Sequence, residues 1–393
     1  MVNILGINLS EFKESEVLKK IADFLVDGQQ HYIVTPNPEI ILAAGKDEEF
    51  AYVLNEATLA LADGFGLKLA CLLFGRNLPR VTGADLTAKL LAKAREQKIK
   101  IAVLNWAEGL SKQELIATAL NKYYPGLDFL IIDTNRDKLL TTETINQINN
   151  FAPKVLFCTL GFPYQEKVLF YNLKKLVTVK VALAIGGSFD FITGQTKRAP
   201  KILRNLGLEW LWRVIKEPKR IKRIYRATFV FLGKILKIRF FNPYLYRPNV
   251  ACLLYKKNQG KNKILLIERA DEPGHWQLPQ GGTDGESLEQ AGARELREEI
   301  GTTNFTTKAI FKNLYRYRFP RNSEHKKYCY NYKGQEQGLY VAEFTGTDND
   351  LKIRFWDHIA WKWVDADNLV GEIHPVRETG SKIFLAKFKS LNL

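Results

Sequence analysis

The stretch RELREEIG, residues 294–301, places three acidic side chains close together in a chain whose formal net charge is +16. In a helix, Glu295, Glu298 and Glu299 are spaced i, i+3 and i+4 and share one face. Like charges on one face repel each other, and a bound divalent cation removes that repulsion. Clustered carboxylate oxygens suit Mg²⁺, or Mn²⁺ in its place, and Mg²⁺ in such sites also binds substrate phosphates. The alternative is an acidic helix face that only contacts solvent.

The neighbouring residues predict the helix that such a metal site requires. Ser287 followed by Gln290 is a capping-box pattern, so the helix should cover 288–300. A second face can pack on a sheet and consists of Leu288, Gly292, Leu296 and Ile300. The glycine-rich loop GGTDG precedes this helix, and an acidic face in solvent does not account for it.

These residues resemble the Nudix box, a glycine-to-glycine pattern built around R-E-U-x-E-E, where U is a bulky aliphatic residue. The residues in register are Glu286, Arg294, Glu295, Leu296, Glu298, Glu299 and Gly301. The pattern is broken where Gln280 stands at its first glycine and Thr302 at its last aliphatic position. The resemblance covers 246–393 and implies an α/β/α domain with a mixed sheet.

The Nudix resemblance implies hydrolysis of a nucleoside diphosphate linked to another group. Metal ions polarise the phosphoryl group and activate water in such reactions. The implied ligands are Glu286, Glu295, Glu298 and Glu299, with Glu295 and Glu298 the catalytic pair. Arg294 is expected to orient a glutamate.

Two further runs, WQLPQGG and YKGQEQGLYVAEF, narrow the choice of Nudix substrate. They resemble the corresponding runs of Nudix enzymes that act on RNA 5′ ends or dinucleoside polyphosphates. This resemblance implies that Lys333 and Gln335 contact phosphates. Tyr328, Tyr330 or Tyr332 would stack on a base, although an ordinary aromatic-rich hairpin explains these tyrosines equally well. Hydrolysis of nucleotide sugars is the alternative activity.

Polar residues of a different kind follow apolar runs in the first half of the chain. The runs are HYIVT (31–35), TLALAD (58–63), KIAVLN (100–105), DFLIID (128–133), KVLFCTL (154–160) and VKVALAIGG (179–187). Amphipathic stretches separate them, and this alternation predicts a Rossmann-like, doubly wound parallel sheet. Because ligands bind beyond the carboxyl ends of such strands, the polar residues there are candidate site residues. Turn chemistry explains any one of these strand ends alone.

Together these strand ends resemble the WecB/TagA/CpsF glycosyltransferases, also called glycosyltransferase family 26, over about 1–235. The ordered elements are TPNPE, ADGFGL, RVTGADL, GFPYQE, GGSFDFITG, RAP and GLEWLWRVIKEPKR. The strand end VLNWAEG (103–109) departs from the family by lacking a glycine-rich turn. The resemblance implies inverting transfer of a sugar, of N-acetylmannosamine type, from a UDP-sugar to a polyprenyl-diphosphate-linked acceptor. It implies no metal in this domain and allows self-association through it.

The same resemblance assigns roles to individual residues. Asp63 matches the general base, for which a carboxylate at a strand end is suitable, and its alternative role is a helix cap. Thr35 matches a catalytic position that contacts substrate. Asn37 and Gln165 match substrate-binding positions. Arg80 is expected to neutralise the departing diphosphate and is otherwise a surface arginine.

The charge of the chain is concentrated between the two regions. Residues 196–247 contain 7 Lys and 8 Arg against 2 Glu, which leaves little net charge elsewhere. Apolar residues at 221, 224, 225, 228, 232 and 235 follow a helical spacing, so we predict a basic amphipathic helix lying on the inner membrane surface. The family resemblance adds that Arg213, Arg220 and Arg223 reach the active site. Nucleic-acid binding is the second interpretation and a solvated helix the third.

The chain is therefore divided into a glycosyltransferase core (1–195), a basic appendage with linker (196–245) and a Nudix domain (246–393). We expect a bifunctional enzyme in the cytoplasm, peripheral on the inner membrane face, because no signal peptide or membrane span is seen. The four cysteines are far apart and predict neither disulfides nor a zinc site. In a rival interpretation the first domain is a membrane- or RNA-binding module that delivers the hydrolase.

Overall fold

The computed structural model describes the chain except for residues 201, 204–208, 217–220 and 321–330. The chain forms two compact units, Met1–Arg239 and Phe240–Leu393. In the described residues, no helix is both long enough and apolar enough to cross a membrane.

The first unit is built on a six-stranded sheet in the order β4-β3-β8-β7-β5-β6. Every neighbouring pair in this sheet is parallel. The strands are β3 (His31–Val34), β4 (Leu59–Ala60), β5 (Ile101–Trp106), β6 (Phe129–Thr134), β7 (Val155–Cys158) and β8 (Val181–Ala184). Each lies in one of the apolar runs identified in the sequence, so the prediction of a parallel, doubly wound sheet is confirmed.

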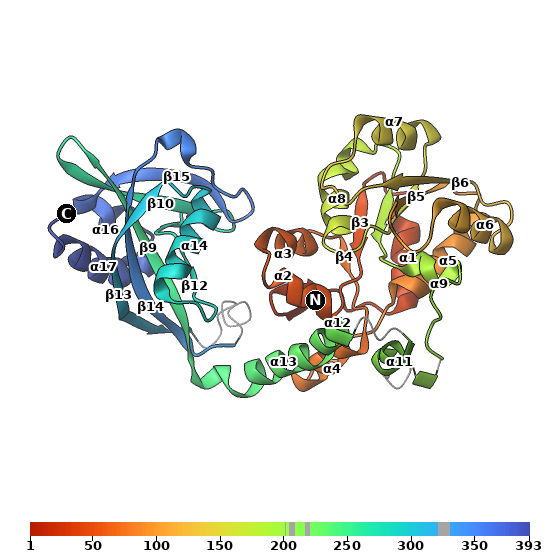
Figure 1. Cartoon of the computed structure of the whole chain (residues 1–393), viewed down its shortest axis with the longest axis horizontal. Helices are drawn as coiled ribbons and strands as arrows, with labels where there is room; N and C mark the ends of the chain where they lie inside the picture. The colour runs from red at the N-terminus through yellow and green to blue at the C-terminus, as the bar shows by residue number, and fades with distance from the viewer. Residues whose placement is uncertain (201, 204–208, 217–220, 321–330) are drawn as a thin grey trace. The chain divides into compact units, whose positions relative to one another are not determined.

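Helices cover both faces of this sheet, and a small hairpin of β1 (Val2–Ile4) and β2 (Ile7–Leu9) precedes them (Figure 1). The helices are α1 (Glu14–Phe24), α2 (Pro38–Ala44), α3 (Glu48–Asn55), α4 (Phe65–Leu73), α5 (Gly83–Glu96), α6 (Gln113–Tyr123), α7 (Thr142–Phe151), α8 (Tyr164–Asn172) and α9 (Ser188–Ile192). Whereas the edge strand β6 is only partly buried, the central strands β3, β7 and β8 are short and wholly buried. Such strands are typical of a sheet covered on both sides.

The basic segment forms α11 (Glu209–Lys216), α12 (Ile221–Tyr225), a π-helical turn (Arg226–Val230) and α13 (Phe231–Phe240). A π turn takes more residues than an α turn and rotates the side chains that follow it. Ile224, Phe231 and Ile235 are buried, whereas Tyr225, Phe229 and Leu236 are exposed. The predicted apolar stripe is therefore split, because part of it packs against the unit and a different set of apolar residues faces solvent.

The second unit contains a seven-stranded mixed sheet with the main order β11-β10-β9-β14-β13, to which β12 and β15 add by pairing with β9 and β10. β9 and β14 are parallel neighbours, and the other pairs are antiparallel. The strands are β9 (Tyr246–Asn258), β10 (Lys261–Arg269), β11 (Trp276–Gln277), β12 (Gln280–Gly282), β13 (Phe305–Arg318), β14 (Gly334–Phe344) and β15 (His358–Asp365).

Helices lie on the two faces of this mixed sheet. α14 (Leu288–Ile300) packs on one face, and α16 (Leu369–Glu372) with α17 (Glu378–Lys389) packs on the other. Alternate residues of β9 enter the two cores, with Leu253 on the α17 side and Cys252 on the α14 side. The predicted α/β/α domain is confirmed. Helix α14 begins after Ser287 with the capping box and ends at Gly301, as its sequence indicated.

Gly292 sets how closely α14 approaches the sheet. A Cβ at this position would lie 2.4 Å from Cγ of Tyr340, a side chain that is 1% exposed. We therefore expect Gly292→Ala to destabilise the second unit by about 1–3 kcal/mol, since a well-packed core does not yield without strain. Calorimetric unfolding of the full chain measures this. Gly371→Ala is the control, because a Cβ there meets nothing within 4 Å, and equal unfolding of the two variants would contradict the prediction.

Candidate active sites

A large cavity in the first unit lies where the parallel strands end. Its volume is about 840 Å³. The five polar residues predicted from the strand ends all line it: Thr35, Asn37, Asp63, Arg80 and Gln165. The topology brings them together because the carboxyl ends of parallel strands meet at one edge of the sheet.

The Asp63 carboxylate is held at the start of α5. Its Oδ2 accepts a hydrogen bond from the backbone N–H of Gly83 at 3.2 Å. The positive end of a helix dipole favours a carboxylate at this position. The alternative role as cap of the next helix is not observed, because Gly64 occupies the N-cap of α4 and no side chain caps it. Asp63 is thus positioned by a helix distant in sequence, and it lines the cavity.

Thr35 and Asn37 each use one polar atom in a hydrogen bond within the fold. The Thr35 hydroxyl donates to the carbonyl of Ala184 at 3.0 Å, which leaves its oxygen as an acceptor. The Asn37 side-chain oxygen accepts from the backbone N–H groups of Glu39 and Ile40 and so caps α2. Its Nδ2 group is the part left to bind a ligand.

Two further arginines, Arg136 and Arg198, line the cavity together with Arg80, and sequence reasoning gave neither of them a role. Arg198 forms a bidentate pair with Asp85, at 2.6 and 2.7 Å, and belongs to the RAP motif. The Arg136 guanidinium lies 3.4 Å from the ring centre of Trp106 and donates to the carbonyl of Leu160. Trp106 stands in the strand end that departs from the glycosyltransferase pattern, and this departure was the available signal. Three guanidinium groups around one cavity suit a diphosphate.

The appendage forms an apolar wall of the same cavity through Ile224, Ala227, Thr228, Phe231 and Leu232. Arg220 lies outside the described residues. Arg213 and Arg223 lie in helices α11 and α12, but their side chains are also outside the described part. Their predicted contact with the substrate therefore remains a prediction.

The second site is organised around Arg294 on α14. Its Nη1 donates to Glu295 at 2.7 Å and to Glu298 at 3.0 Å. Its Nε donates to Glu286 at 2.8 Å, and its Nη2 donates to the carbonyl of Gly282. Although burial opposes the charge, the hydrogen bonds and ion pairs with these glutamates raise the pKa of Arg294. Arg294 therefore orients several carboxylates at once.

Glu299 has different partners from the other glutamates. Its Oε2 accepts from the backbone N–H of Gln280 at 2.9 Å. Its Oε1 lies 3.8 Å from Nε2 of His358. Burial lowers the pKa of His358 to about 4, so this ring is neutral at pH 7 and does not neutralise Glu299. The backbone donor therefore fixes one oxygen of Glu299 beside the loop that precedes α14.

The loop before α14 explains why the first glycine of the Nudix pattern is dispensable here. Gln280 fits because its side chain pairs with Gln277 and Gln337. The strict requirement falls on Gly281, where a Cβ would lie 1.9 Å from Oε1 of Glu295. Glycine at 281 thus lets the nearly buried Glu295 carboxylate lie against the loop.

The carboxylates around Arg294 fit a hard divalent cation, which prefers oxygen ligands of this kind. Glu295, Glu298 and Glu299 would hold it, with Glu286 at the exposed rim. Glu286, Glu295 and Glu298 contact the Arg294 guanidinium, whereas Glu299 is held by the N–H of Gln280. In the part of the chain that the structure describes, these carboxylates do not form a set of three with ligand atoms within 4.8 Å of one another.

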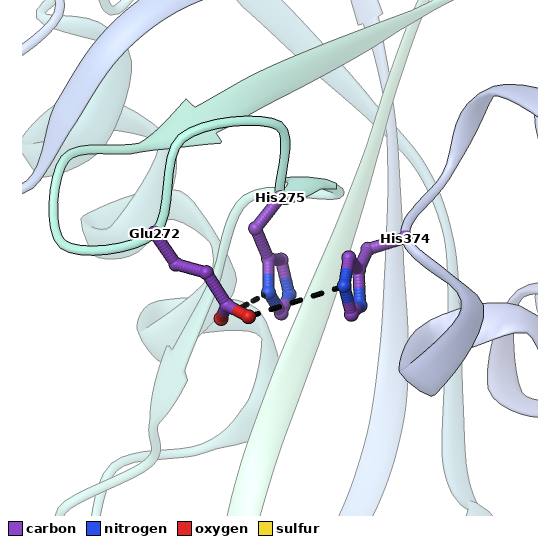
Figure 2. A group of neighbouring side chains, drawn as sticks. All are labelled: Glu272, His275 and His374. Atoms are coloured by element: carbon purple, nitrogen blue, oxygen red, sulfur yellow. Dashed lines mark hydrogen bonds and ion pairs between the residues drawn. The ribbon is translucent and has the colours of Figure 1, made fainter.

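The one such set among the described residues is Glu272, His275 and His374 (Figure 2). The two imidazole rings are stacked, with centres 4.0 Å apart and planes 6° apart. An imidazole nitrogen binds a metal in its ring plane, and two parallel, separated planes share no such point. Glu272 accepts from Nδ1 of His275 at 2.7 Å and lies 4.0 Å from Nε2 of His374. The arrangement is a carboxylate joining two loops, not a metal chelate.

A small cavity near Gln280 contains polar residues that sequence reasoning missed. Gln277, Tyr317, Gln337 and Arg377 line it. Lys333 and Gln335 do not line it, although Gln335 accepts a hydrogen bond from Tyr317. Lys333 instead lies 5.3 Å from the ring centre of Tyr246. Tyr328 and Tyr330 are outside the described residues, and Tyr332 is partly buried.

The fold and the two sites define a two-unit α/β enzyme with a glycosyltransferase unit and a Nudix unit. Residues 2–243 match the family described as "Glycosyl transferase WecG/TagA/CpsF family", and residues 245–387 match "NUDIX domain". The chain belongs to the WecG/TagA/CpsF glycosyltransferase family and carries a C-terminal Nudix domain. Both resemblances seen in the sequence are confirmed.

Two curated relatives are N-acetylglucosaminyldiphosphoundecaprenol N-acetyl-beta-D-mannosaminyltransferases. The one from Bacillus subtilis (strain 168) is 32% identical over 218 residues, which are 53% of this chain and 82% of the relative. The one from Staphylococcus aureus (strain MRSA252) is 30% identical over 242 residues, which are 61% of this chain and 93% of the relative.

Among solved structures, a C. elegans Ap4A hydrolase binary complex covers 37% of this chain and 98% of its own, with 21% identity and a TM-score of 0.29. The E. coli dihydroneopterin triphosphate pyrophosphohydrolase covers 36% of this chain and 99% of its own, with 20% identity and a TM-score of 0.29.

Gly281→Ala tests the cation site. The added Cβ displaces the Glu295 carboxylate, so we expect affinity for Mn²⁺ to fall by about tenfold or more, as when the surroundings of a metal ligand are disturbed. Titration calorimetry of the full chain with Mn²⁺ measures it. Gly371→Ala should bind as the wild type does, and an unchanged affinity in Gly281→Ala would show that Glu295 is not a ligand.

Proposed function

We propose that the first unit transfers a sugar, of N-acetylmannosamine type, from a UDP-sugar to a polyprenyl-diphosphate-linked acceptor with inversion. The observation that carries the proposal is one cavity that holds the Asp63 carboxylate and three arginines. The activity named for the two relatives supports it. We infer no metal in this step, because guanidinium groups take the place that a cation has at a departing diphosphate.

Asp63 accepts the proton of the acceptor hydroxyl as that oxygen attacks the anomeric carbon. The bond between this carbon and the UDP oxygen breaks on the opposite face, and the electron pair leaves with UDP. Arg80, Arg136 and Arg198 line the cavity in which this negative charge develops. The wall formed by Phe231 and its neighbours limits water around the reacting atoms.

We propose further that the second unit hydrolyses a phosphoanhydride in a nucleoside-diphosphate-linked substrate of dinucleoside polyphosphate or RNA 5′-end type. A bound Mg²⁺ or Mn²⁺ would polarise the phosphoryl group and activate water. Glu295, Glu298 and Glu299 would hold the cation, and Arg294 fixes two of these carboxylates. Tyr317 offers a ring for a base beside this site, and Arg377 offers a cation for a phosphate. Nucleotide sugars are the second candidate substrate.

The appendage is proposed to place the first unit on the inner membrane surface. Ile221, Tyr225, Phe229, Val230 and Leu236 expose apolar side chains. Lys222, Arg226, Lys237 and Arg239 are exposed among them. Apolar side chains that alternate with basic ones are typical of a helix at an anionic lipid surface. A lipid-linked acceptor would then be presented to the cavity that the same helices line.

Phosphorus NMR of the purified chain tests the two activities together. The mixture contains a panel of UDP-sugars, a short lipid-diphosphate-N-acetylglucosamine acceptor and Mg²⁺. We expect UDP to form only with acceptor, and Asp63→Asn to lower this rate by about a hundredfold or more. Chelation of the metal should spare the transfer.

The remaining products in the same experiment assign the second unit. UMP plus sugar phosphate, lost in Glu298→Gln, would establish nucleotide sugars as its substrate. Without these products, dinucleoside polyphosphates and 5′-triphosphate RNA are supplied, and hydrolysis lost in Glu298→Gln supports the main proposal. Absence of transfer with every donor, while lipid or RNA is still bound, would instead identify the first unit as a binding module.

Vesicle flotation tests the membrane proposal. The full chain should float with vesicles containing anionic phosphatidylglycerol and remain behind with neutral phosphatidylcholine. Replacing Phe229 and Leu236 by serine removes exposed apolar area, so flotation should fall by about tenfold or more. Serine at the exposed Leu139 and Val177, which lie away from the appendage, is the control. Equal flotation of the two double variants would refute the assignment.

A further inference from the structure

Glu166 is a fully buried carboxyl group next to the cavity residue Gln165 on α8. Its exposed fraction is 0%. Its Oε1 accepts a hydrogen bond from Nε2 of Gln165 at 2.8 Å, and its Oε2 is buried without a hydrogen-bond partner. Burial raises the pKa of Glu166 to about 7. A buried polar atom without a partner destabilises the fold, so this residue requires an explanation other than stability.

The side-chain amide of Gln165 is oriented from both ends. Its Oε1 accepts from the backbone N–H of Gly186 at 2.9 Å, and its Nε2 donates to Glu166. A backbone N–H only donates and the bonded carboxyl oxygen only accepts, so together they fix which end of the amide is nitrogen. Nε2 carries two hydrogens, and in the described residues only one has an acceptor. Gln165 lines the cavity, where the second hydrogen is left for a ligand.

We propose that Glu166 is a positioning residue for sugar transfer. It holds the Gln165 amide so that the second N–H of Gln165 donates a hydrogen bond to an oxygen of the UDP-sugar. This inference rests on the proposed transfer and deepens it, because it gives a role to a residue that does not line the cavity. Without the Glu166 acceptor, the Gln165 amide keeps only its bond to Gly186. The nitrogen end is then no longer fixed toward the substrate.

A double-mutant cycle separates this role from a structural one. Glu166→Leu removes the acceptor, and Glu166→Gln retains an acceptor oxygen in the same shape. With saturating lipid acceptor and varied UDP-sugar, Glu166→Leu should lower kcat/KM for the donor by about tenfold, as the loss of one hydrogen bond implies. Glu166→Gln should recover most of that loss, and the KM for the acceptor should stay unchanged. In a Gln165→Met background, Glu166→Leu should cause no further loss.

The inference would be overturned if the losses in kcat/KM from Gln165→Met and Glu166→Leu multiplied in the double variant. It would also be overturned if Glu166→Gln were as impaired as Glu166→Leu. Glu166→Asp provides a second comparison if the leucine variant does not fold. Its shorter side chain keeps the carboxyl group but withdraws it from Gln165, so we expect Glu166→Asp to lower kcat/KM for the donor as Glu166→Leu does.

Binding without catalysis distinguishes failure of this inference from failure of the proposed function. Calorimetry measures UDP-N-acetylmannosamine binding to each variant in the absence of acceptor. Wild-type protein that neither binds nor transfers the sugar overturns the proposed function and this inference with it. Wild-type protein that does both, with independent effects of Gln165 and Glu166, overturns the inference alone.

Discussion

Both sites depend on one constraint, which is that a carboxylate placed in or beside a core must be given a donor. Asp63 accepts a hydrogen bond from the N–H of Gly83, and Glu299 accepts one from the N–H of Gln280. Glu295 is met by Arg294. Removing such a group from water is unfavourable unless it is hydrogen-bonded. The requirement therefore determines which strand end, helix start or arginine must lie beside each carboxylate, and so determines the shape of each site.

The same constraint separates what could be predicted from the sequence from what could not. The apolar runs and their strand ends predicted the parallel sheet, the Nudix resemblance implied the mixed sheet, and the capping box at Ser287 predicted the start of α14. The residues at strand ends shared one cavity because topology requires it. Arg136 and Arg198 were given no role from the sequence, because the contacts that place them in the cavity, with Trp106 and Asp85, join residues far apart in the chain. The appendage stripe is split already before the π turn, because Ile224 packs inward whereas Ile221 and Tyr225 face solvent, and spacing alone does not show which apolar residues pack inward.

The basic character of the chain has two separate uses. In the appendage, Lys222 and Arg226 are exposed among apolar side chains, which suits a charged surface outside the protein. In the cavity, Arg136 and Arg198 are immobilised by stacking or by a carboxylate, which suits a charge that appears at a fixed point during reaction. A mobile surface lysine cannot serve the second purpose, because orienting it during the reaction would cost free energy. The net charge alone therefore says little about either site.

Two residues at the sites, Glu166 and Gly281, reduce the stability of the fold, and this cost points to a role other than folding. Glu166 keeps an oxygen without a partner in the core, although an apolar side chain of similar size would remove that penalty. Glycine at position 281 loses more conformational entropy on folding than another residue would, but it leaves room for the Glu295 side chain. Neither choice is explained by folding. Each is explained if a side chain must present a polar atom to a ligand at one fixed position, which for Gln165 is an amide hydrogen and for Glu295 a carboxylate oxygen.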